Sequence, residues 1–209
     1  MSINSLQESL HKINGELKGT EERREKLLKG TRDVISLCSK SIVDLHYGKK
    51  DEAKEKLHKA GEMLTEFHGY TKDDLQKYLL VPEQEFVEAS VFRSLIEDSD
   101  IPSADDLKVS GPAYVMGLLD CVGECKRRVY DQIRKGNFIE AQNLFSFMEK
   151  IYGFVYPFSI YDNLVGGLKR KLDVAKMLIE DVRSLVTEES RRQSLMAAVD
   201  RLENRFRSA

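Results

Sequence analysis

Apolar side chains recur every third or fourth position from residue 5 to about residue 46, which is the spacing of one face of an α-helix. These positions are Leu6, Leu10, Ile13, Leu17, Leu27, Leu28, Val34, Ile35, Leu37, Ile42 and Leu45. The pattern is interrupted only around Gly19 and Thr20, so the sequence predicts one long helix with a kink there. Gly48 ends it, and a second apolar stretch over residues 51–68 predicts a helix that packs against the first as a hairpin.

The rest of the chain shows the same helical spacing. The sequence predicts a helical segment from residue 71 to residue 97, in which Pro82 either kinks the helix or opens a new one as its first-turn residue. It predicts further helices over 113–135, 138–156, 159–186 and 188–207, with a short turn capped by Ser103 and Asp106. Alternating apolar and polar residues, the mark of a strand, are absent over any five residues. We therefore expect an all-α fold, one bundle of about seven helices spanning residues 1–209 as a single domain.

The composition restricts the class of protein. The 209 residues are 41% hydrophobic and 33% charged, with a net charge of -2, so any binding of nucleic acid must rely on local basic patches. Three cysteines without a disulfide framework favour a reducing compartment. Cys121 and Cys125 could form half of a zinc site, but no Cys-x-x-Cys or nearby histidine completes it, and buried thiols are the favoured interpretation. Without a leader or an apolar run long enough to span a membrane, the protein is expected to be cytoplasmic.

Two carboxylates occupy an unusual place in the segment that follows Pro82. On a helical wheel Glu85 and Glu88 fall inside a broad arc of apolar residues and lie one turn apart. An unpaired buried carboxylate is costly, so two of them predict a shared cation, for which a metal ion is the simplest candidate.

A second acidic pair interrupts the helix predicted over residues 113–135. Asp120 and Glu124 are the only charged residues in its first half and share one face. They could instead face water, because they point away from the apolar side of the wheel. The four histidines supply no Glu-x-x-His motif, so the predicted site has oxygen ligands only and suits Mg²⁺ or Mn²⁺. Such ions assist phosphodiester hydrolysis. No glycine-rich phosphate loop is present, which argues against a nucleotide triphosphatase.

Basic residues near these pairs are candidate RNA contacts, although each alone is more typical of a solvated face. Arg93 is the strongest candidate, because it is the only cation between residues 83 and 106. The other candidates are Arg32, Lys40, Arg127, Arg128 and the run from residue 169 to 171.

Four stretches resemble the translin superfamily, and most closely its members of the translin-associated factor X type. They are EFVEASVF (85–92), GLLDCVGEC (117–125), FSFMEKIYGF (145–154) and LKRKLDVAKMLIEDV (168–182). The resemblance covers roughly residues 20–186, and Glu-x-x-Glu followed by Asp-x-x-x-Glu is its most specific part.

This resemblance implies a helical bundle whose subunits form a closed, usually octameric shell around RNA. It also implies a Mg²⁺-dependent endoribonuclease acting on single-stranded RNA. Glu85, Glu88 and Asp120 match the family's catalytic acids, Glu124 matches an adjacent acid, and Glu149 is an addition without a family match. The chain lacks the basic leader and the long insert of the larger catalytic members, so we expect it to assemble with itself.

Three functions remain open from the sequence. The first is a metal-dependent endoribonuclease in which Glu85, Glu88 and Asp120 hold the metal and Glu124 adjusts its surroundings, the attacking group being water or the ribose 2′-hydroxyl. The second is a non-catalytic oligomer that binds single-stranded nucleic acid, and the third is a structural scaffold. A homo-oligomer is expected because apolar surface exceeds the need of one bundle at Phe145, Phe147, Tyr152, Phe154, Tyr156 and Phe158.

Overall fold

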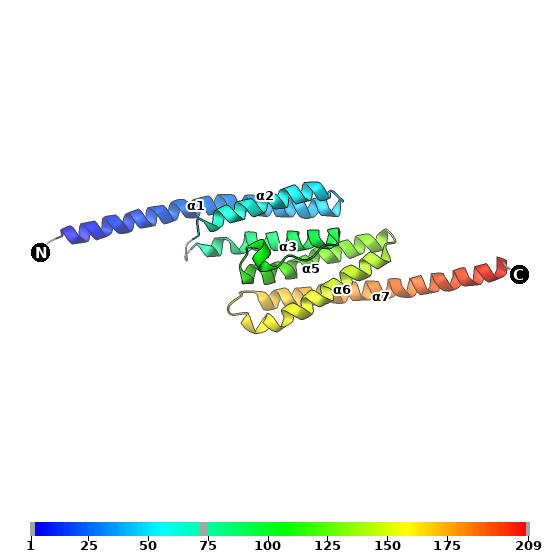
Figure 1. Cartoon of the computed structure of the whole chain (residues 1–209). Coiled ribbons are helices and arrows are strands. Elements are labelled where there is room, and N and C mark those ends of the chain that lie inside the picture. Colours follow the sequence, from blue (N-terminus) through cyan, green and yellow to red (C-terminus); the bar gives the residue numbers. More distant parts are fainter. Residues whose placement is uncertain (1–2, 72–74, 208–209) are drawn as a thin grey trace. The chain divides into compact units, whose positions relative to one another are not determined.

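The computed structural model describes residues 3–71 and 75–207, and most of these residues are helical with no strand among them. This confirms the all-α class and the expected number of helices (Figure 1). The elements are α1 (Asn4–His46), α2 (Lys50–His68), the 3₁₀ turn η1 (Gln76–Tyr78), α3 (Leu80–Glu97), α4 (Ala104–Leu107), α5 (Gly111–Arg134), α6 (Phe138–Val155), the 3₁₀ turn η2 (Tyr156–Tyr161) and α7 (Leu168–Arg207).

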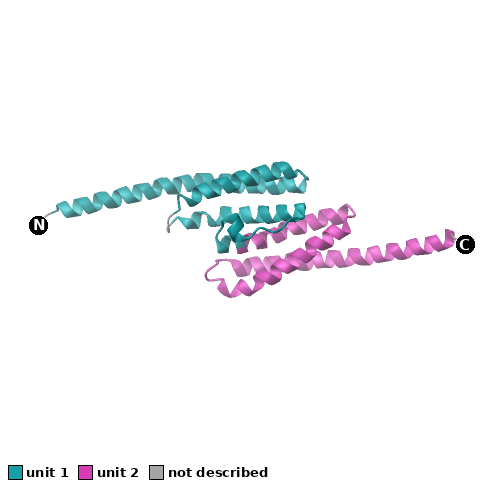
Figure 2. Cartoon of the chain, viewed as in Figure 1, with its two compact units in different colours: residues 1–114 teal, residues 115–209 magenta. Residues whose placement is uncertain are grey.

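The chain divides into two compact units, residues 1–114 and residues 115–209 (Figure 2). Unit 1 contains α1 to α4 and the first residues of α5, and unit 2 contains the rest of α5 with α6 and α7. The single domain predicted from the sequence stays a prediction. None of the described helices is both long and apolar enough to cross a membrane.

In unit 1, α1 and α2 form the predicted hairpin, and α3 packs on both helices. Gly48 has a φ of +78°, a left-handed conformation that glycine adopts at little cost, and it lets the chain reverse between α1 and α2. The ring of Phe67 on α2 lies against Gly30 of α1, where a side chain would collide with it. The one long helix predicted here is confirmed, because α1 is continuous through Gly19 and Thr20, and the kink at these residues stays a prediction.

In unit 2, α6 and α7 lie side by side and bury apolar residues along both helices (Figure 1). The two last predicted helices are in fact one, α7, because the sequence around residue 187 contains neither glycine nor proline to end a helix. The predicted start of this helix, at residue 159, is also too early. Gly167, with a φ of +87°, belongs to the turn before the helix, so α7 begins at Leu168.

The aromatic residues expected to join subunits differ in exposure. Phe145, Phe147 and Tyr152 are partly buried within unit 2. Phe154, Tyr156 and Phe158 are exposed, and so are three residues that the sequence analysis did not include, Ile160, Tyr161 and Leu164. We call the six exposed residues the η2 apolar surface. Their exposure agrees with the prediction of surplus apolar surface.

Candidate functional site

The first predicted acidic pair lies on α3. Pro82 occupies the first turn of this helix, where the missing N–H of proline has no helical partner to lose, and Asp98 ends it in a left-handed conformation. Glu85 and Glu88 are partly buried, and Val87 and Ala89 next to Glu88 in the sequence are fully buried. The helix therefore holds both carboxylates close to the core of unit 1, as the wheel predicted.

Both carboxylates act on the same buried thiol. Cys38 on α1 is fully buried, and this burial, followed by the negative charges of Glu85 and Glu88, raises the pKa of its thiol well above the ordinary range. Both carboxylates belong to α3, which packs on α1, the helix that carries Cys38. Four residues after Glu88, the ring centroid of Phe92 lies 4.8 Å from that of His46. No sequence pattern marks His46, because the distance between His46 and α3 depends on how the α1–α2 hairpin packs.

The most buried carboxylate of α3 is one that the sequence analysis did not select. The side chain of Glu83 is only 5% exposed. Its Oε1 lies 2.8 Å from Nε2 of His68, and its Oε2 accepts hydrogen bonds from the backbone N–H of Ser110 at 3.0 Å and from the Ser110 hydroxyl at 2.6 Å. Glu83 thus ties the end of α2 and the start of α5 to α3, which is a structural role.

The second predicted pair lies on α5 in unit 2. Asp120 and Glu124 are both partly buried and one helical turn apart. Lys171 of α7 donates a hydrogen bond from its ammonium group to Oδ1 of Asp120. The basic residue Lys171, proposed above as an RNA contact, therefore pairs with a predicted metal ligand. Glu149, the acid without a family match, pairs with Arg183 at 2.8 Å.

The two acidic pairs belong to different units. Among the described residues, neither unit by itself gathers three or more His, Cys, Asp or Glu side chains in a group that could hold a metal ion. This includes the buried Cys121 and Cys125, whose sulfurs lie 4.0 Å apart, so unit 2 supplies no further ligand for a zinc site there. The four-carboxylate site stays a prediction that requires both units.

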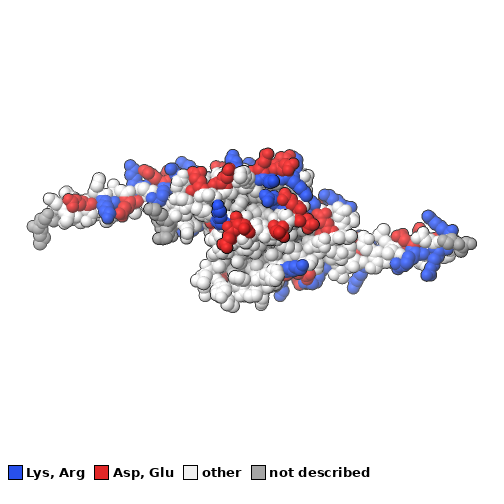
Figure 3. Space-filling view, in the orientation of Figure 1, with Lys and Arg blue, Asp and Glu red and all other residues white. Residues whose placement is uncertain are grey.

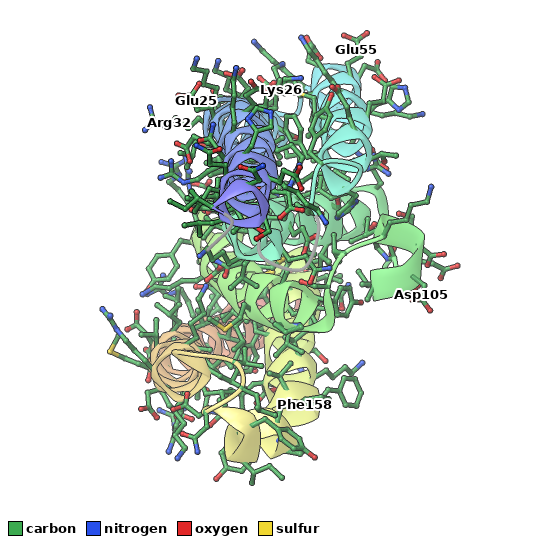
Figure 4. All side chains as sticks on the ribbon, turned by 90° about the vertical axis from the view of Figure 1, so that its left-hand side faces the viewer. Glu25, Lys26, Arg32, Glu55, Asp105 and Phe158 are labelled. Carbon is green, nitrogen blue, oxygen red and sulfur yellow. The ribbon has the colours of Figure 1, made fainter. Side chains whose placement is uncertain are left out.

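The predicted RNA contacts differ in exposure. Arg32 and Lys40 are exposed on α1, where Arg32 projects outward (Figure 4). On the face shown in Figure 3, basic and acidic side chains are interspersed over α1 and α2. Arg93 is partly buried, lies 3.3 Å from Glu97 and lines a cavity of about 520 Å³ between α2, α3 and α4.

Two further predicted RNA contacts on α5 are neighbours with different environments. Arg127 is exposed, but the side chain of Arg128 is only 14% exposed and bonds Glu140 of α6 through Nε at 3.2 Å and Nη2 at 2.9 Å. The buried Gln132 donates to the same oxygen of Glu140. Arg128 therefore joins α5 to α6, whereas Arg127 is open to solvent.

Comparison with known proteins places this arrangement in a family. No protein-family model matches the chain. It is 34% identical over 160 residues to the uncharacterized protein MJ0175 of Methanocaldococcus jannaschii, a match that covers 75% of this chain and 72% of that protein. Two structures of AfC3PO are 32% identical and cover 88% of this chain. The one in complex with duplex RNA has a TM-score of 0.82 and is covered over 97% of its length, and the other has 0.79 and 98%. The chain belongs to the translin superfamily.

A structure of apo-NeC3PO is similar to this chain in fold alone. The two are 20% identical with a TM-score of 0.76, and the match covers 85% of this chain and 95% of that one. In this chain one acidic pair lies on α3 and the other on α5. Carboxylate oxygens are hard ligands, so the donor set of Glu85, Glu88, Asp120 and Glu124 fits Mg²⁺ or Mn²⁺ better than a metal that prefers sulfur or imidazole.

Proposed function

We propose that the chain forms an RNA-binding homo-oligomer that cleaves single-stranded RNA in a metal-dependent reaction. Its similarity to AfC3PO, a complex determined with duplex RNA, supports RNA as the ligand. The observation that carries cleavage is the partial burial of Glu85 and Glu88, two carboxylates that lie one helical turn apart on α3 beside its buried core residues.

The proposed site draws two carboxylates from each unit. Glu85 and Glu88 on α3 would hold Mg²⁺ together with Asp120 on α5, with Glu124 adjusting the surroundings, and Mn²⁺ could substitute. A bound Mg²⁺ would make water or a ribose hydroxyl a better nucleophile and offset the negative charge that builds up on the phosphate. Glu85 and Glu88 are partly buried on α3, so part of the water around each carboxylate is already excluded. Lys171 orients the side chain of Asp120 by donating to its Oδ1.

A second function is favoured by one observation. The ammonium of Lys171 already compensates the charge of Asp120, as expected of a protein that needs no metal there. On this alternative the chain is a non-catalytic oligomer that binds single-stranded nucleic acid, and the carboxylates have structural roles.

Cleavage assays with single variants separate the two functions. The purified protein is incubated with end-labelled single-stranded RNA, and with a duplex of the same sequence, in Mg²⁺ or in chelator. We expect Mg²⁺-dependent cleavage of the single strand. Glu88→Ala and Asp120→Ala should lower the rate roughly 10²-fold or more, because each removes a proposed metal ligand. Both variants should still bind RNA, since the loss of a negative charge does not weaken attraction to phosphate.

The control is Glu55→Ala, which removes a carboxylate exposed to solvent on α2 (Figure 4) and should cleave at the wild-type rate. If the wild-type protein binds RNA without Mg²⁺-dependent cleavage, the non-catalytic function takes the place of this proposal. Near wild-type cleavage by Glu88→Ala or Asp120→Ala would show that the proposed residues are wrong.

A further inference from the structure

One seam of residues runs along the whole of α1 with the strict spacing of a coiled coil. Its positions alternate by three and four: Ile3, Leu6, Leu10, Ile13, Leu17, Thr20, Arg24, Leu27, Thr31, Val34, Cys38, Ser41 and Leu45. This is the a and d pattern of a heptad repeat, which keeps one face of a helix against a partner helix over many turns. We call residues 27–45 the inner part of α1 and residues 3–20 its outer part.

The inner part of the seam is covered by the chain itself. All six of its residues are buried, because α2 and α3 pack on this side of α1. The hydroxyl of Ser41 donates to the backbone oxygen of Ala53 on α2 at 3.0 Å. Toward the N-terminus, the contacts of α1 with the rest of unit 1 include the ring of Tyr70 near Lys26 and the hydroxyl of Tyr78, which accepts from Nε of Arg24 at 2.9 Å.

The outer part keeps the same register but is open to solvent. Ile3, Leu6, Leu10, Ile13 and Leu17 are each between 48% and 64% exposed. Figure 1 shows this part of α1 extending beyond α2. Helices this short are marginal in water by themselves, and five large apolar side chains in one row add a cost that a partner helix would remove. Because this row keeps the register of the covered part through Thr20 and Arg24, the partner is expected to be a helix as well.

Among the described helices, the end of α7 also carries a row of exposed apolar residues, and it fits this role less well. The buried face of α7 ends at Val186, whereas its exposed row begins at Leu195, nine residues or about half a turn out of phase, so the row does not continue the packed face. The net charges of the outer part of α1 and of the end of α7 give no attraction between these two segments. Residues 3–20 hold two acids and two bases (2 − 2 = 0), and residues 188–207 hold five arginines and four acids (5 − 4 = +1). A second copy of α1 is therefore the remaining candidate partner. Of the four charged residues in the outer part of α1, only Glu16 lies beside the seam.

The direction of pairing follows from what covers the inner part. In a parallel pair, the α2 and α3 helices of both copies would need the same space beside the joined seams, and Glu16 would face Glu21 of the second copy. An antiparallel pair avoids both conflicts. We propose that the outer part of α1 pairs with that of a second copy as an antiparallel coiled coil, with Leu6 opposite Leu17 and Leu10 opposite Ile13.

Engineered cysteines test the pairing and its direction. The native cysteines are all buried, so the wild-type chain provides the background. Under mild oxidation, Leu6→Cys and Leu17→Cys should each stay unlinked, because like positions lie far apart in an antiparallel pair. The double variant should form a disulfide-linked dimer. Linkage of either single variant would show a parallel pair, and no linkage in any variant would overturn the proposal.

A second measurement does not depend on a disulfide. The double variant Leu10→Glu, Ile13→Glu should halve the mass of the assembly in sedimentation equilibrium, because four carboxylates would lie in the seam. Gly15→Glu is the matched control. It adds a carboxylate in the same stretch of α1, at a position where nothing lies within 4 Å, and should keep the wild-type mass. An unchanged mass for the double variant would overturn the proposal, whereas RNA cleavage is tested independently.

Discussion

At the scale of single residues, the helical wheel predicted the acidic pair of α3 but not what surrounds it. Glu85 and Glu88 could be placed on one face because they belong to one helix, whose period is fixed. Their effect on Cys38 needs a second helix, so only the structure shows it. The same limit explains Glu83. Its partners His68 and Ser110 are 15 and 27 residues away, and no local signal marks it as the buried acid.

The raised pKa of Cys38 gives a prediction for stability against pH. An unfolded thiol ionises near pH 8.5, whereas burial together with Glu85 and Glu88 keeps the folded thiol protonated above that. The folded state therefore holds one more proton than the unfolded state in this range. Its stability is complete below about pH 8.5 and should fall by about 1.4 kcal/mol per pH unit above it.

Urea unfolding at several pH values measures this slope. Cys38→Ala leaves a cavity and lowers the stability at every pH, but between about pH 8.5 and 9.5 its free energy of unfolding should decline less than that of the wild type. Below about pH 8 the two slopes should agree, because the thiol is then protonated in both states. Equal slopes above pH 8.5 would contradict the prediction.

At the scale of helices, the sequence predicts where helices occur better than where they end. The α1–α2 hairpin follows from Gly48 and the apolar spacing on both sides of it. The sequence predicts a helix boundary at the polar stretch near residue 187, but nothing in this stretch breaks a helix, and α7 continues through it. The close approach of Phe67 to α1 could not be predicted, since Gly30 has no local feature that separates it from Gly15 or Gly19.

Substitution of these glycines should have opposite effects within one helix. A β-carbon at Gly30 would lie 2.1 Å from Cζ of Phe67, so Gly30→Ala should displace the ring and lower the free energy of unfolding by about 1–3 kcal/mol. Gly15→Ala meets nothing within 4 Å and should raise helix content by favouring the helical backbone, with a gain of at most about 1 kcal/mol. Urea midpoints and far-ultraviolet circular dichroism measure both. A neutral Gly30→Ala would show that Phe67 does not fix the hairpin.

At the scale of the whole molecule, the fold class and the helix count were predicted because helical periodicity extends over most of the chain. The assembly of the site was not testable in this way. Helical spacing places Glu85 with Glu88 and Asp120 with Glu124, but it carries no information on how the two units meet. The surplus of apolar surface could be predicted from composition, whereas the exposure of Ile160 and Leu164 depends on the turn at η2.

The η2 apolar surface should contribute to self-association. Its six residues are between 45% and 79% exposed, and covering them in a subunit interface would be favourable. We expect Ile160→Asp combined with Leu164→Asp to lower the mass measured by light scattering at micromolar concentration. Met177→Asp alters a single exposed apolar residue of α7 outside this surface and should keep the wild-type mass. A wild-type mass for the double variant would exclude this surface from the interface.

The inner part of α1 is packed on unit 1 and the outer part is exposed to solvent, so the two parts should differ in how readily their backbone amides exchange. One uninterrupted helix contains amides that are held by the core and amides that only the helix itself holds, so its two parts should open with very different free energies. Hydrogen–deuterium exchange should divide α1 near Arg24, with slow exchange on the side of Leu27 and fast exchange on the side of Leu17. Within α1, raising the protein concentration should slow the exchange of the outer amides and leave the inner ones unchanged, because the inner amides are already held by unit 1.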